Sequence, residues 1–386
     1  MKNIEPFILI DELSKHLGNR LPKANQHLKI VITIPAKNEE RSIERTLLAI
    51  RNQLQSNSVF FDFKFFEVLV LCNHCSDNTE KICKLFKYND PHFPLHILST
   101  KASLVNNVGV ARRILMNIAS ERLPIANGII VSTDADTVPD NFWLHNFVQY
   151  ISTDIALICG RIEVDEADLH PKAKKYLSAN RKYLYLASQL ESSLYPDPAD
   201  PWPKHAHNSG PNLAIKKYAY QKIGGIPPLG FLEDIAMYQL VVGHGLKVRH
   251  CLKSAVVTST RTTPRVPGGF GNQLREWSEL NGSVYEYMVE GIDKLRVKFE
   301  TYELIKELYK TGSTSLLLEI SKRLLIPLEQ VKELYSTHER QQAMVRFLET
   351  DLMNNVLWNS KYPDEDVFQV IHDLEAYLNP VPQANY

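Results

Sequence analysis

The feature that most constrains the fold is a regular alternation of short apolar runs and amphipathic segments along the first 135 residues. The run Ile-Val-Ile-Thr-Ile at residues 30–34 is continuous and largely β-branched, as in a strand buried on both faces, and Pro35 is expected to stop it. Strands and helices that alternate in this way form βαβ units, whose ligands bind beyond the carboxyl ends of the strands. The sequence therefore predicts an α/β fold, with a mainly parallel sheet flanked by helices. The further predicted strands are 68–71, 96–99 and 128–132, and the further predicted helices are 79–86 and 110–119.

A helix is predicted directly after the first strand. Asn38 has a side chain that can cap it, and the acidic residues Glu39 and Glu40 favour the positive N-terminal end of a helix. Apolar residues then recur at helical spacing, at Ile43, Leu47, Ile50 and Leu54.

The pattern changes after the first half of the chain. A strand is predicted at 155–164, a long helix at 167–190 and an irregular, proline-rich binding loop at 196–211. Beyond about residue 291 the apolar spacing is helical, with stripes at 316–325, 329–334 and 343–357. We expect three parts: an N-terminal extension at 1–28, an α/β domain at 29–290 and a helical C-terminal module at 291–386.

Composition excludes some classes of function. The 386 residues carry a formal net charge of zero, so no bulk charge attracts nucleic acid or an anionic membrane. The longest apolar run near the N-terminus, at 7–10, is too short for a signal peptide or a transmembrane segment. The five cysteines fit reduced thiols, and we expect a cytoplasmic protein. Nothing in the sequence decides between a monomer and a homo-oligomer.

Two aspartates close the predicted strand at 128–132. In extended backbone the side chains of Asp134 and Asp136 point to one side, which suits a hard divalent cation, Mg²⁺ or Mn²⁺, that also holds a diphosphate. Paired aspartates at a strand end also occur as helix caps, although here Asp140 could cap the helix expected at 142–147.

Polar loops follow the first two predicted strands. Pro35 fixes the turn after the first strand, and Glu39 or a neighbour could accept a hydrogen bond from a ribose hydroxyl. A plain helix start accounts for these residues equally well. The loop 73–79 could read the edge of a base, or it could be an ordinary turn with Asp77 as a helix cap.

Charged residues elsewhere suit an anionic ligand. Lys101, Arg112 and Arg113 could contact phosphate, and an exposed charged helix face is the alternative. The arginines of the loop 260–271, Arg261 and Arg265, could close over a leaving diphosphate.

An acidic pair, Glu233 and Asp234, opens a helix predicted to run to residue 242. Acids in a first helical turn are favoured by the helix dipole, and a carboxylate held there could also act as a general base. Upstream, His207 is either an acceptor-pocket residue or an ordinary loop histidine.

Taken in order, these segments resemble the family 2 glycosyltransferases of the GT-A fold over roughly residues 29–280. Residues 34–40, Ile-Pro-Ala-Lys-Asn-Glu-Glu, look like the opening motif of that family, and Asp134-Ala-Asp136 looks like its DxD motif. Gly210-Pro-Asn212-Leu-Ala-Ile looks like the acceptor-side segment, which implies that Gly210 and Asn212 bind the acceptor, and Glu233-Asp234 looks like the ED motif.

The resemblance also implies roles. Asp136, assisted by Asp134, would hold the divalent cation and the donor phosphates, and Asp234 would be the catalytic base, next to Glu233. Pro35, Ala36, Asn38 and Glu39 would cradle the nucleoside of a nucleotide-sugar donor.

Two departures from the family pattern bear on substrate. Asn73 stands where the family usually has an aspartate that contacts uracil, which leaves the donor base open. The Q-x-x-R-W motif of processive synthases is imperfect, because Gln273-Leu-Arg275-Glu-Trp277 has its arginine one place early. We therefore expect a non-processive enzyme.

The resulting hypothesis is metal-dependent, inverting transfer of a sugar, of the hexosyltransferase type, from a nucleotide-sugar donor to an acceptor hydroxyl. The acceptor is not indicated by the sequence. One alternative is a non-catalytic protein that binds nucleotide or sugar. Another is a haloacid-dehalogenase-type phosphatase with Asp134 as nucleophile, although that motif normally lies on the first strand rather than the fourth.

Overall fold

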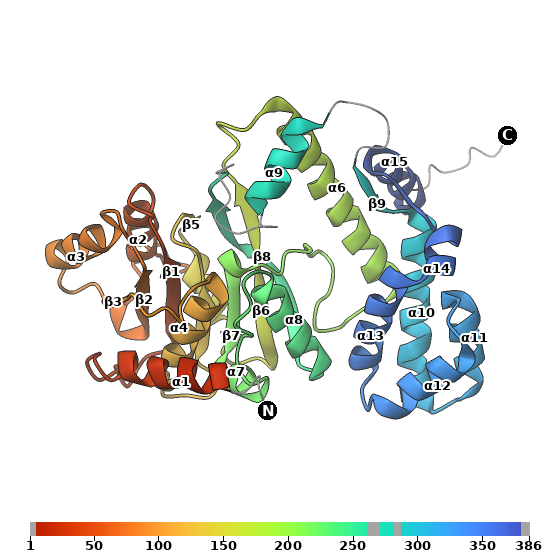
Figure 1. Cartoon of the computed structure of the whole chain (residues 1–386), viewed down its shortest axis with the longest axis horizontal. Coiled ribbons are helices and arrows are strands. Elements are labelled where there is room, and N and C mark those ends of the chain that lie inside the picture. Colours follow the sequence, from red (N-terminus) through yellow and green to blue (C-terminus); the bar gives the residue numbers. More distant parts are fainter. Residues whose placement is uncertain (1–4, 261–269, 281–286, 380–386) are drawn as a thin grey trace. The chain divides into compact units, whose positions relative to one another are not determined.

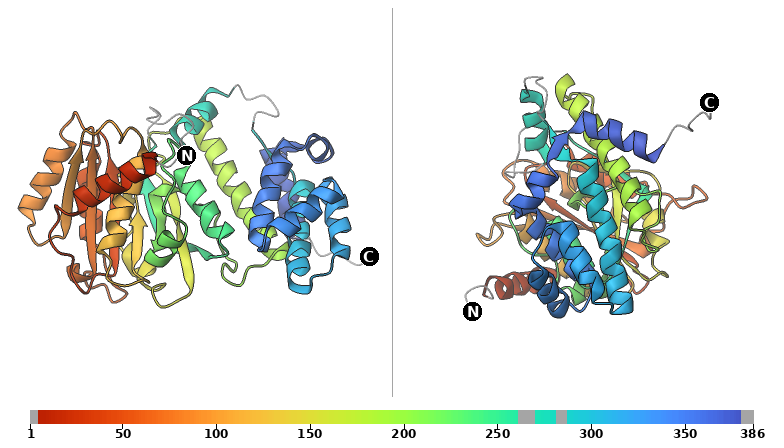
Figure 2. Two further views of the ribbon diagram at one scale, coloured as in Figure 1. Left: turned by 60° about the horizontal axis from the view of Figure 1, so that its bottom comes forward. Right: turned by 90° about the vertical axis from the view of Figure 1, so that its right-hand side faces the viewer.

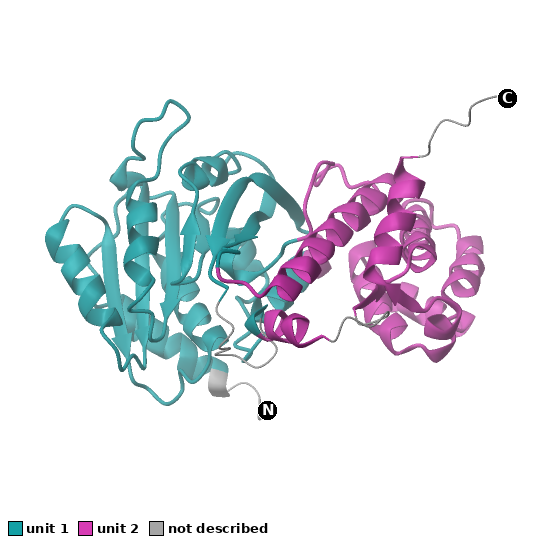
Figure 3. Cartoon of the chain, turned by 90° about the horizontal axis from the view of Figure 1, so that it is seen from above, with its two compact units in different colours: residues 1–167, 207–241, 246–271 teal, residues 168–206, 242–245, 272–386 magenta. Residues whose placement is uncertain are grey.

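The computed structural model describes residues 5–260, 270–280 and 287–379, and these divide into two compact units (Figure 3). The boundaries predicted at 28/29 and 290/291 do not coincide with this division. The N-terminal segment belongs to unit 1, and the long helix after residue 170 belongs to unit 2. Unit 1 comprises residues 1–167, 207–241 and 246–271, and unit 2 comprises residues 168–206, 242–245 and 272–386.

Unit 1 contains a sheet with the strand order β3-β2-β1-β4-β7-β6-β8-β5 (Figure 1). Its first four strands pair in parallel, and each lies where the sequence predicts a strand. Strands β1, β2 and β4 are nearly fully buried, which explains their continuous apolar runs, whereas β3 at the edge of the sheet is partly exposed. Their bounds are β1 (Ile30–Ala36), β2 (Phe66–Asn73), β3 (Leu95–Thr100) and β4 (Ile129–Ser132).

The second half of the sheet is mixed. The short strand β7 (Leu213–Lys216) lies antiparallel between β4 and β6 (Ile155–Val164). The long strand β8 (Lys247–Thr258) runs parallel to β6, and β5 (Thr137–Pro139) pairs antiparallel with β8. The predicted fold class, a mainly parallel sheet flanked by helices, is confirmed.

Strand β1 continues through Pro35, so the prediction that proline stops it is wrong. Pro35 pairs in register with Leu71 of β2, whereas β4 pairs with β1 only as far as Thr33. Proline lacks a backbone N–H, and it is tolerated here because the pairing with β4 has already ended.

The helices of unit 1 follow the predicted order, but the first begins late. It starts at Ile43, after Ser42, and Asn38 does not cap it. Asn38 has a φ of 56°, and its Oδ1 accepts a hydrogen bond from the Ser76 backbone N–H at 2.8 Å. The side chain is therefore used to join two loops. The helices are α2 (Ile43–Arg51), α3 (Thr79–Asn89), α4 (Val108–Arg122), α5 (Trp143–Val148), α7 (Lys217–Lys222) and α8 (Glu233–Gly243), with the 3₁₀ turns η1 (Phe63–Phe65) and η2 (Gly210–Asn212).

The predicted N-terminal extension forms the helix α1 (Glu5–Gly18), which packs against α4 (Figure 2). Ile10 and Leu17 are buried in this contact. The Asp11 carboxylate accepts hydrogen bonds from Arg113 at 3.3 Å and from Asn117 at 2.8 Å. Helix α1 is thus an integral part of the α/β unit.

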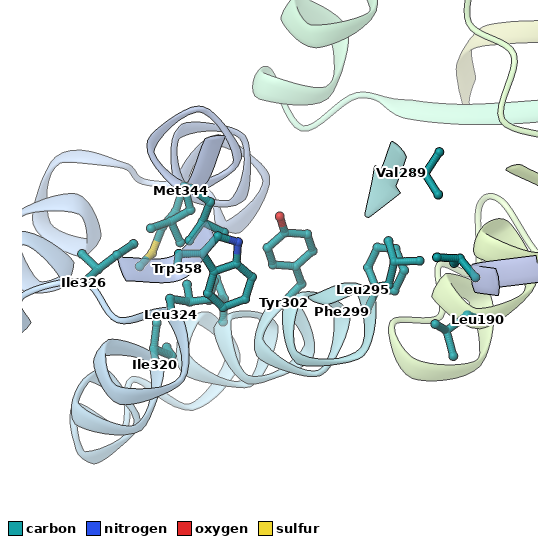
Figure 4. Close-up of a cluster of buried hydrophobic side chains, with 14 of the residues drawn as sticks. Leu190, Val289, Leu295, Phe299, Tyr302, Ile320, Leu324, Ile326, Met344 and Trp358 are labelled. Carbon is teal, nitrogen blue, oxygen red and sulfur yellow. The ribbon is translucent and has the colours of Figure 1, made fainter. Parts of the chain in front are cut away.

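Unit 2 is helical, with a core of aliphatic and aromatic side chains (Figure 4). The apolar stripe predicted at 343–357 is broken at Asn355, whose Oδ1 accepts from the Trp358 N–H and starts a new helix. Trp358 is 1% exposed and lies in one cluster with Tyr302 and Leu324. The elements of this unit are α6 (Pro171–Leu194), most of α9 (Phe270–Glu279), β9 (Met288–Glu290), α10 (Ile292–Thr311), α11 (Ser315–Leu324), α12 (Leu328–Thr337), α13 (Gln341–Asn354), α14 (Val356–Lys361), β10 (Asp364–Asp366) and α15 (Val367–Leu378).

None of the helices in the described residues has the length and apolarity that a membrane crossing requires.

Candidate active site

The loops after β1 and β2 are joined by side-chain hydrogen bonds. Asp77 Oδ1 accepts from the Thr79 N–H at 3.0 Å and Asp77 Oδ2 accepts from the Glu40 N–H at 3.0 Å. Burial opposes ionisation, but these bonds outweigh it and lower the pKa of Asp77. Both carboxylate oxygens thus make hydrogen bonds within the fold, which favours the alternative for Asp77, a cap at the start of α3, over a contact with the donor.

The end of β1 lies beside this joined pair of loops. Ala36 is buried, and Pro35 is half-buried in register with β2. The Glu39 N–H donates to Thr79 Oγ1 at 2.6 Å, and its Oε2 accepts from Ser42 Oγ at 2.8 Å. These contacts fix the backbone where the nucleoside is predicted to bind, and Pro35, Ala36, Asn38 and Glu39 remain predicted donor contacts.

Asn73 ends β2 with an unsatisfied acceptor. The residue is 5% exposed, and its Oδ1 has no hydrogen-bond donor among the described residues. A buried acceptor without a partner costs about 1–3 kcal/mol, so a ligand donor at this point would be stabilising. Lys101, just beyond β3, is exposed. Both remain predicted donor contacts.

Asp134 and Asp136 lie just beyond β4, where the sheet pattern predicts a ligand. The Asp134 side chain is 31% exposed, and its Oδ1 accepts from Arg112 Nη2 at 3.0 Å. Desolvation raises the pKa of Asp134 to about 6, with Arg112 opposing the shift and the negative charge of Asp136 adding to it. Two carboxylates thus lie close enough to repel each other.

Arg112 of α4 does not point a free guanidinium at the donor, as the sequence suggested. The residue is 3% exposed. Its Nε donates to Glu233 Oε1 at 3.0 Å, its Nη2 to Asp134, and its Nη1 to Ser132 Oγ and to the Gly210 carbonyl. All three nitrogens are used within the protein, which corrects the donor assignment.

Helix α8 brings the acidic pair to the same place. Glu233 is buried against Arg112, and Asp234 is half-buried. Asp234 Oδ2 accepts from the Gly210 N–H at 2.6 Å, and its Oδ1 accepts from the Ile235 N–H at 2.8 Å. The backbone of Gly210 therefore contacts both Asp234, through its N–H, and Arg112, through its carbonyl. The carboxylates that follow β4 and open α8 thus share one site within unit 1.

Asn212 is not available to an acceptor, so its prediction is wrong. The residue is 0% exposed. Its Oδ1 accepts from Trp143 Nε1 at 2.8 Å, and its Nδ2 donates to the carbonyls of Arg161 and Ser254 at 2.9 and 3.0 Å. A Cβ at Gly160 would lie 2.2 Å from Nδ2, so glycine is needed there. Asn212 joins β6, α5 and β8.

Replacing Asn212 by alanine is expected to destabilise unit 1 without a specific effect on substrate. The change removes three hydrogen bonds and leaves the buried Trp143 Nε1–H without its acceptor, at a cost of about 3 kcal/mol. Thermal unfolding of Asn212→Ala would show the loss as a lower Tm. A Tm equal to that of the wild type would contradict the structural role.

The remaining predicted acceptor residues differ in their surroundings. Gly210 is buried and gives its N–H and carbonyl to Asp234 and Arg112, so it supports the carboxylates instead of facing an acceptor. His207 is half-buried, and its Nδ1 accepts from the Ile162 N–H at 3.0 Å. Arg261 and Arg265 lie outside the described residues.

The carboxylates fit a divalent cation. No group of three His, Cys, Asp or Glu side chains arranged to hold a metal ion occurs in the part of the chain that the structure describes. Magnesium and similar cations, however, are commonly bound by one or two carboxylates together with substrate phosphates and water. Asp134 and Asp136 are such a pair, and a cation bound between them would offset the repulsion that Asp136 exerts on Asp134.

The supporting roles of two residues were not predicted from the sequence. Ser132, the last residue of β4, accepts from Arg112, and the backbone of Gly210 contacts both ends of the site. A single serine or glycine gives no sequence signal, because only the fold shows what lies beside it.

Three solved structures illustrate the similarity to known proteins. Mannosyltransferase PcManGT from Pyrobaculum calidifontis, in complex with GDP-Man and Mn²⁺, is 14% identical, with 91% of this chain and 95% of that chain covered and a TM-score of 0.43. TarS 1-349 from S. aureus, in complex with UDP-GlcNAc, is 13% identical, with 88% and 99% covered and a TM-score of 0.44. Glucosyl-3-phosphoglycerate synthase from Mycobacterium tuberculosis, in complex with Mn²⁺, UDP-Glc and phosphoglyceric acid, is 17% identical, with 69% and 82% covered and a TM-score of 0.39. Similarity at this level does not identify a substrate.

A comparison with curated proteins gives no match. The sequence model described as glycosyl transferase family 2 matches residues 31–224, which is half of the chain and includes most of β1, residues 134–136 and Gly210. The chain belongs to the family 2 glycosyltransferases.

Proposed function

We propose that this glycosyltransferase carries out metal-dependent, inverting and non-processive transfer of a sugar from a nucleotide-sugar donor to an acceptor hydroxyl. The observation that carries the proposal is the convergence of three carboxylates from two separate elements around Arg112 and Gly210, with a fourth, Asp136, close enough to repel Asp134. Asp134 and Asp136 come from the end of β4, and Glu233 and Asp234 come from the start of α8.

The donor is assigned to the carboxyl ends of β1, β2 and β4. The nucleoside would lie against Pro35, Ala36 and Glu39, and the buried Oδ1 of Asn73 would accept a hydrogen bond from the base. Asp134 and Asp136 would hold Mn²⁺ or Mg²⁺. When bound, that cation neutralises negative charge on the departing diphosphate.

Asp234 is assigned as the general base. Its Oδ2 is oriented by the Gly210 N–H, and the residue lies in the first turn of α8. In this role Asp234 removes the proton from the acceptor hydroxyl as the hydroxyl oxygen attacks the anomeric carbon. A single displacement of this kind inverts the configuration. His207 is the remaining candidate for the acceptor side, and Arg261 and Arg265 remain candidates for contact with the diphosphate.

Of the alternatives, the phosphatase is not supported. The family model that matches residues 31–224 describes a glycosyl transferase, and Asp134 follows the fourth strand instead of the first. A non-catalytic binding protein would bind a nucleotide sugar and release it unchanged, even with a divalent cation and a panel of acceptors. Turnover of the sugar would exclude that alternative.

The test is a thermal-shift panel with UDP, GDP, ADP and their sugars, with MnCl₂ or with EDTA. One nucleotide series is expected to raise the Tm in MnCl₂ and to lose the effect in EDTA. A ligand that binds only the native state at 100 times its Kd stabilises that state by about 2.7 kcal/mol. An equal shift in EDTA would contradict metal-dependent donor binding.

A further inference from the structure

Arg112 lies between the acidic pairs of β4 and α8 and forms an ion pair with a carboxylate of each. Its side chain is 4% exposed, and that of Glu233 is 5% exposed. The acids of this site are Asp134, Asp136, Glu233 and Asp234. The charges of Asp134, Glu233 and Asp234 raise the pKa of Arg112, although burial acts to lower it. A guanidinium with a fixed planar fork holds its partners in defined directions, unlike the point charge of lysine.

The position of the guanidinium depends on Gly210. A Cβ at this residue would lie 2.7 Å from Arg112 Nη2 and 2.8 Å from Arg112 Cζ, both too close for a side chain. The carbonyl of Gly210 accepts from Arg112 Nη1 at 3.2 Å, while its N–H donates to Asp234. One residue's backbone therefore links the guanidinium to the proposed general base.

Burial makes this arrangement rigid. Taking a guanidinium out of water is unfavourable unless its charge and its N–H groups are matched, and here two carboxylates, a hydroxyl and a carbonyl match them. Removing Arg112 would leave Asp134 and Glu233 close together without a counter-charge. Both would then turn away from each other, and the spacing between the β4 and α8 carboxylates would change.

We propose that Arg112 is a positioning residue, which acts on transfer through Asp134 and Glu233 and makes no contact with the donor phosphates. The inference rests on the proposed function, because it assigns Arg112 to the reaction of that same site. It predicts that catalysis depends on the fork of the guanidinium and not only on its charge.

The first test compares Arg112→Lys with Arg122→Lys. Arg122 lies on the same helix, has a side chain that is 8% exposed, and donates to Glu67 Oε2 at 2.6 Å, away from the acidic pairs. The measurements are Tm and the steady-state hydrolysis of UDP-, GDP- and ADP-sugars in MnCl₂. Both variants are expected to lose similar stability, while Arg112→Lys alone loses about 100-fold in kcat, as misplacement of reacting groups by about 1 Å can cause. Equal kcat values for the two variants would overturn the inference.

A double-mutant cycle separates positioning from direct contact with phosphate. If Arg112 acts through Glu233, the double variant Arg112→Lys/Glu233→Gln is expected to be no slower than the slower single variant. Losses that multiply, together with a donor KM raised tenfold or more by Arg112→Lys, would show direct contact with phosphate and overturn the inference.

Gly210→Ala serves if Arg112→Lys does not fold. This variant keeps the arginine but displaces its guanidinium, so the same loss of kcat is expected, and wild-type kcat would overturn the inference.

The proposed function and the role of Arg112 are contradicted by different results. A wild-type chain that neither binds nor turns over any nucleotide sugar of the panel contradicts the proposed function. An active wild type whose Arg112→Lys variant matches Arg122→Lys contradicts only the role of Arg112.

Discussion

Asp234→Asn is expected to abolish sugar transfer while leaving donor binding nearly unchanged. Asparagine keeps the shape of the side chain and can still accept from the Gly210 N–H, but it cannot take a proton from an acceptor hydroxyl. Loss of a general base lowers the rate by about 10²–10⁴-fold, and this is the largest effect that we expect of any single change. The measurements are kcat for transfer or donor hydrolysis, and the Kd of the nucleotide in MnCl₂ by titration calorimetry.

The matched control for this prediction is Asp77→Asn. Both oxygens of Asp77 accept hydrogen bonds that join two loops, so this variant should lose stability while its kcat changes little. Equal losses of donor binding and transfer in Asp234→Asn would contradict the assignment of Asp234 as the base.

Asp136→Asn is expected to lower kcat/KM by at least about 100-fold and to make nucleotide binding insensitive to Mn²⁺. A bound cation contributes several kcal/mol of charge stabilisation, and each 1.36 kcal/mol corresponds to about a factor of ten in rate. A neutral amide is a weaker ligand for a hard cation than a carboxylate. The measurement is a titration of MnCl₂ against donor hydrolysis for the variant and the wild type.

Asp140→Asn controls for the removal of a nearby negative charge in the sequence, just beyond β5. Asp140 accepts from the N–H groups of Phe142 and Ala255 at 3.0 and 3.2 Å, so its carboxylate supports the fold. This variant should keep the Mn²⁺ dependence of the wild type. An Asp136→Asn enzyme with the same Mn²⁺ dependence would show that the cation binds elsewhere.

The parallel half of the sheet was predictable because its strands are buried on both faces. A continuous apolar run such as that of β1, followed by a helical segment, is typical of a strand in a parallel sheet. The antiparallel strand β7 was not predicted. Its four residues are too short a run to show a period, and its place between β4 and β6 depends on contacts that are distant in the sequence.

The candidate site was predicted in part. Local patterns and the family resemblance predict that four acids lie at strand and helix ends, namely Asp134, Asp136, Glu233 and Asp234. They do not predict which residues surround each side chain. Arg112 lies on a helix where an arginine could face solvent, phosphate or the core, and only the packing of α4 against β4 and α8 decides among these.

The surroundings of Asn212 could not be predicted from the sequence either. Its neighbours in the sequence resemble an acceptor-binding segment, yet its amide is used by residues that are 42 to 69 positions away. Hydrogen bonds of that range are set by topology and leave no local pattern. Only the structure therefore shows whether a polar residue next to a catalytic motif binds a ligand or stabilises the fold.

The most direct test of the account is the position of the cation itself. Crystals grown with MnCl₂ and the nucleoside diphosphate selected from UDP, GDP and ADP would locate Mn²⁺ by its anomalous scattering. We expect one manganese peak at coordination distance from the Asp136 carboxylate, bridging to the diphosphate, with Asp234 facing the same ligand. A manganese ion and nucleotide bound away from Asp134, Asp136 and Asp234 would contradict the central claim that these carboxylates form one catalytic site.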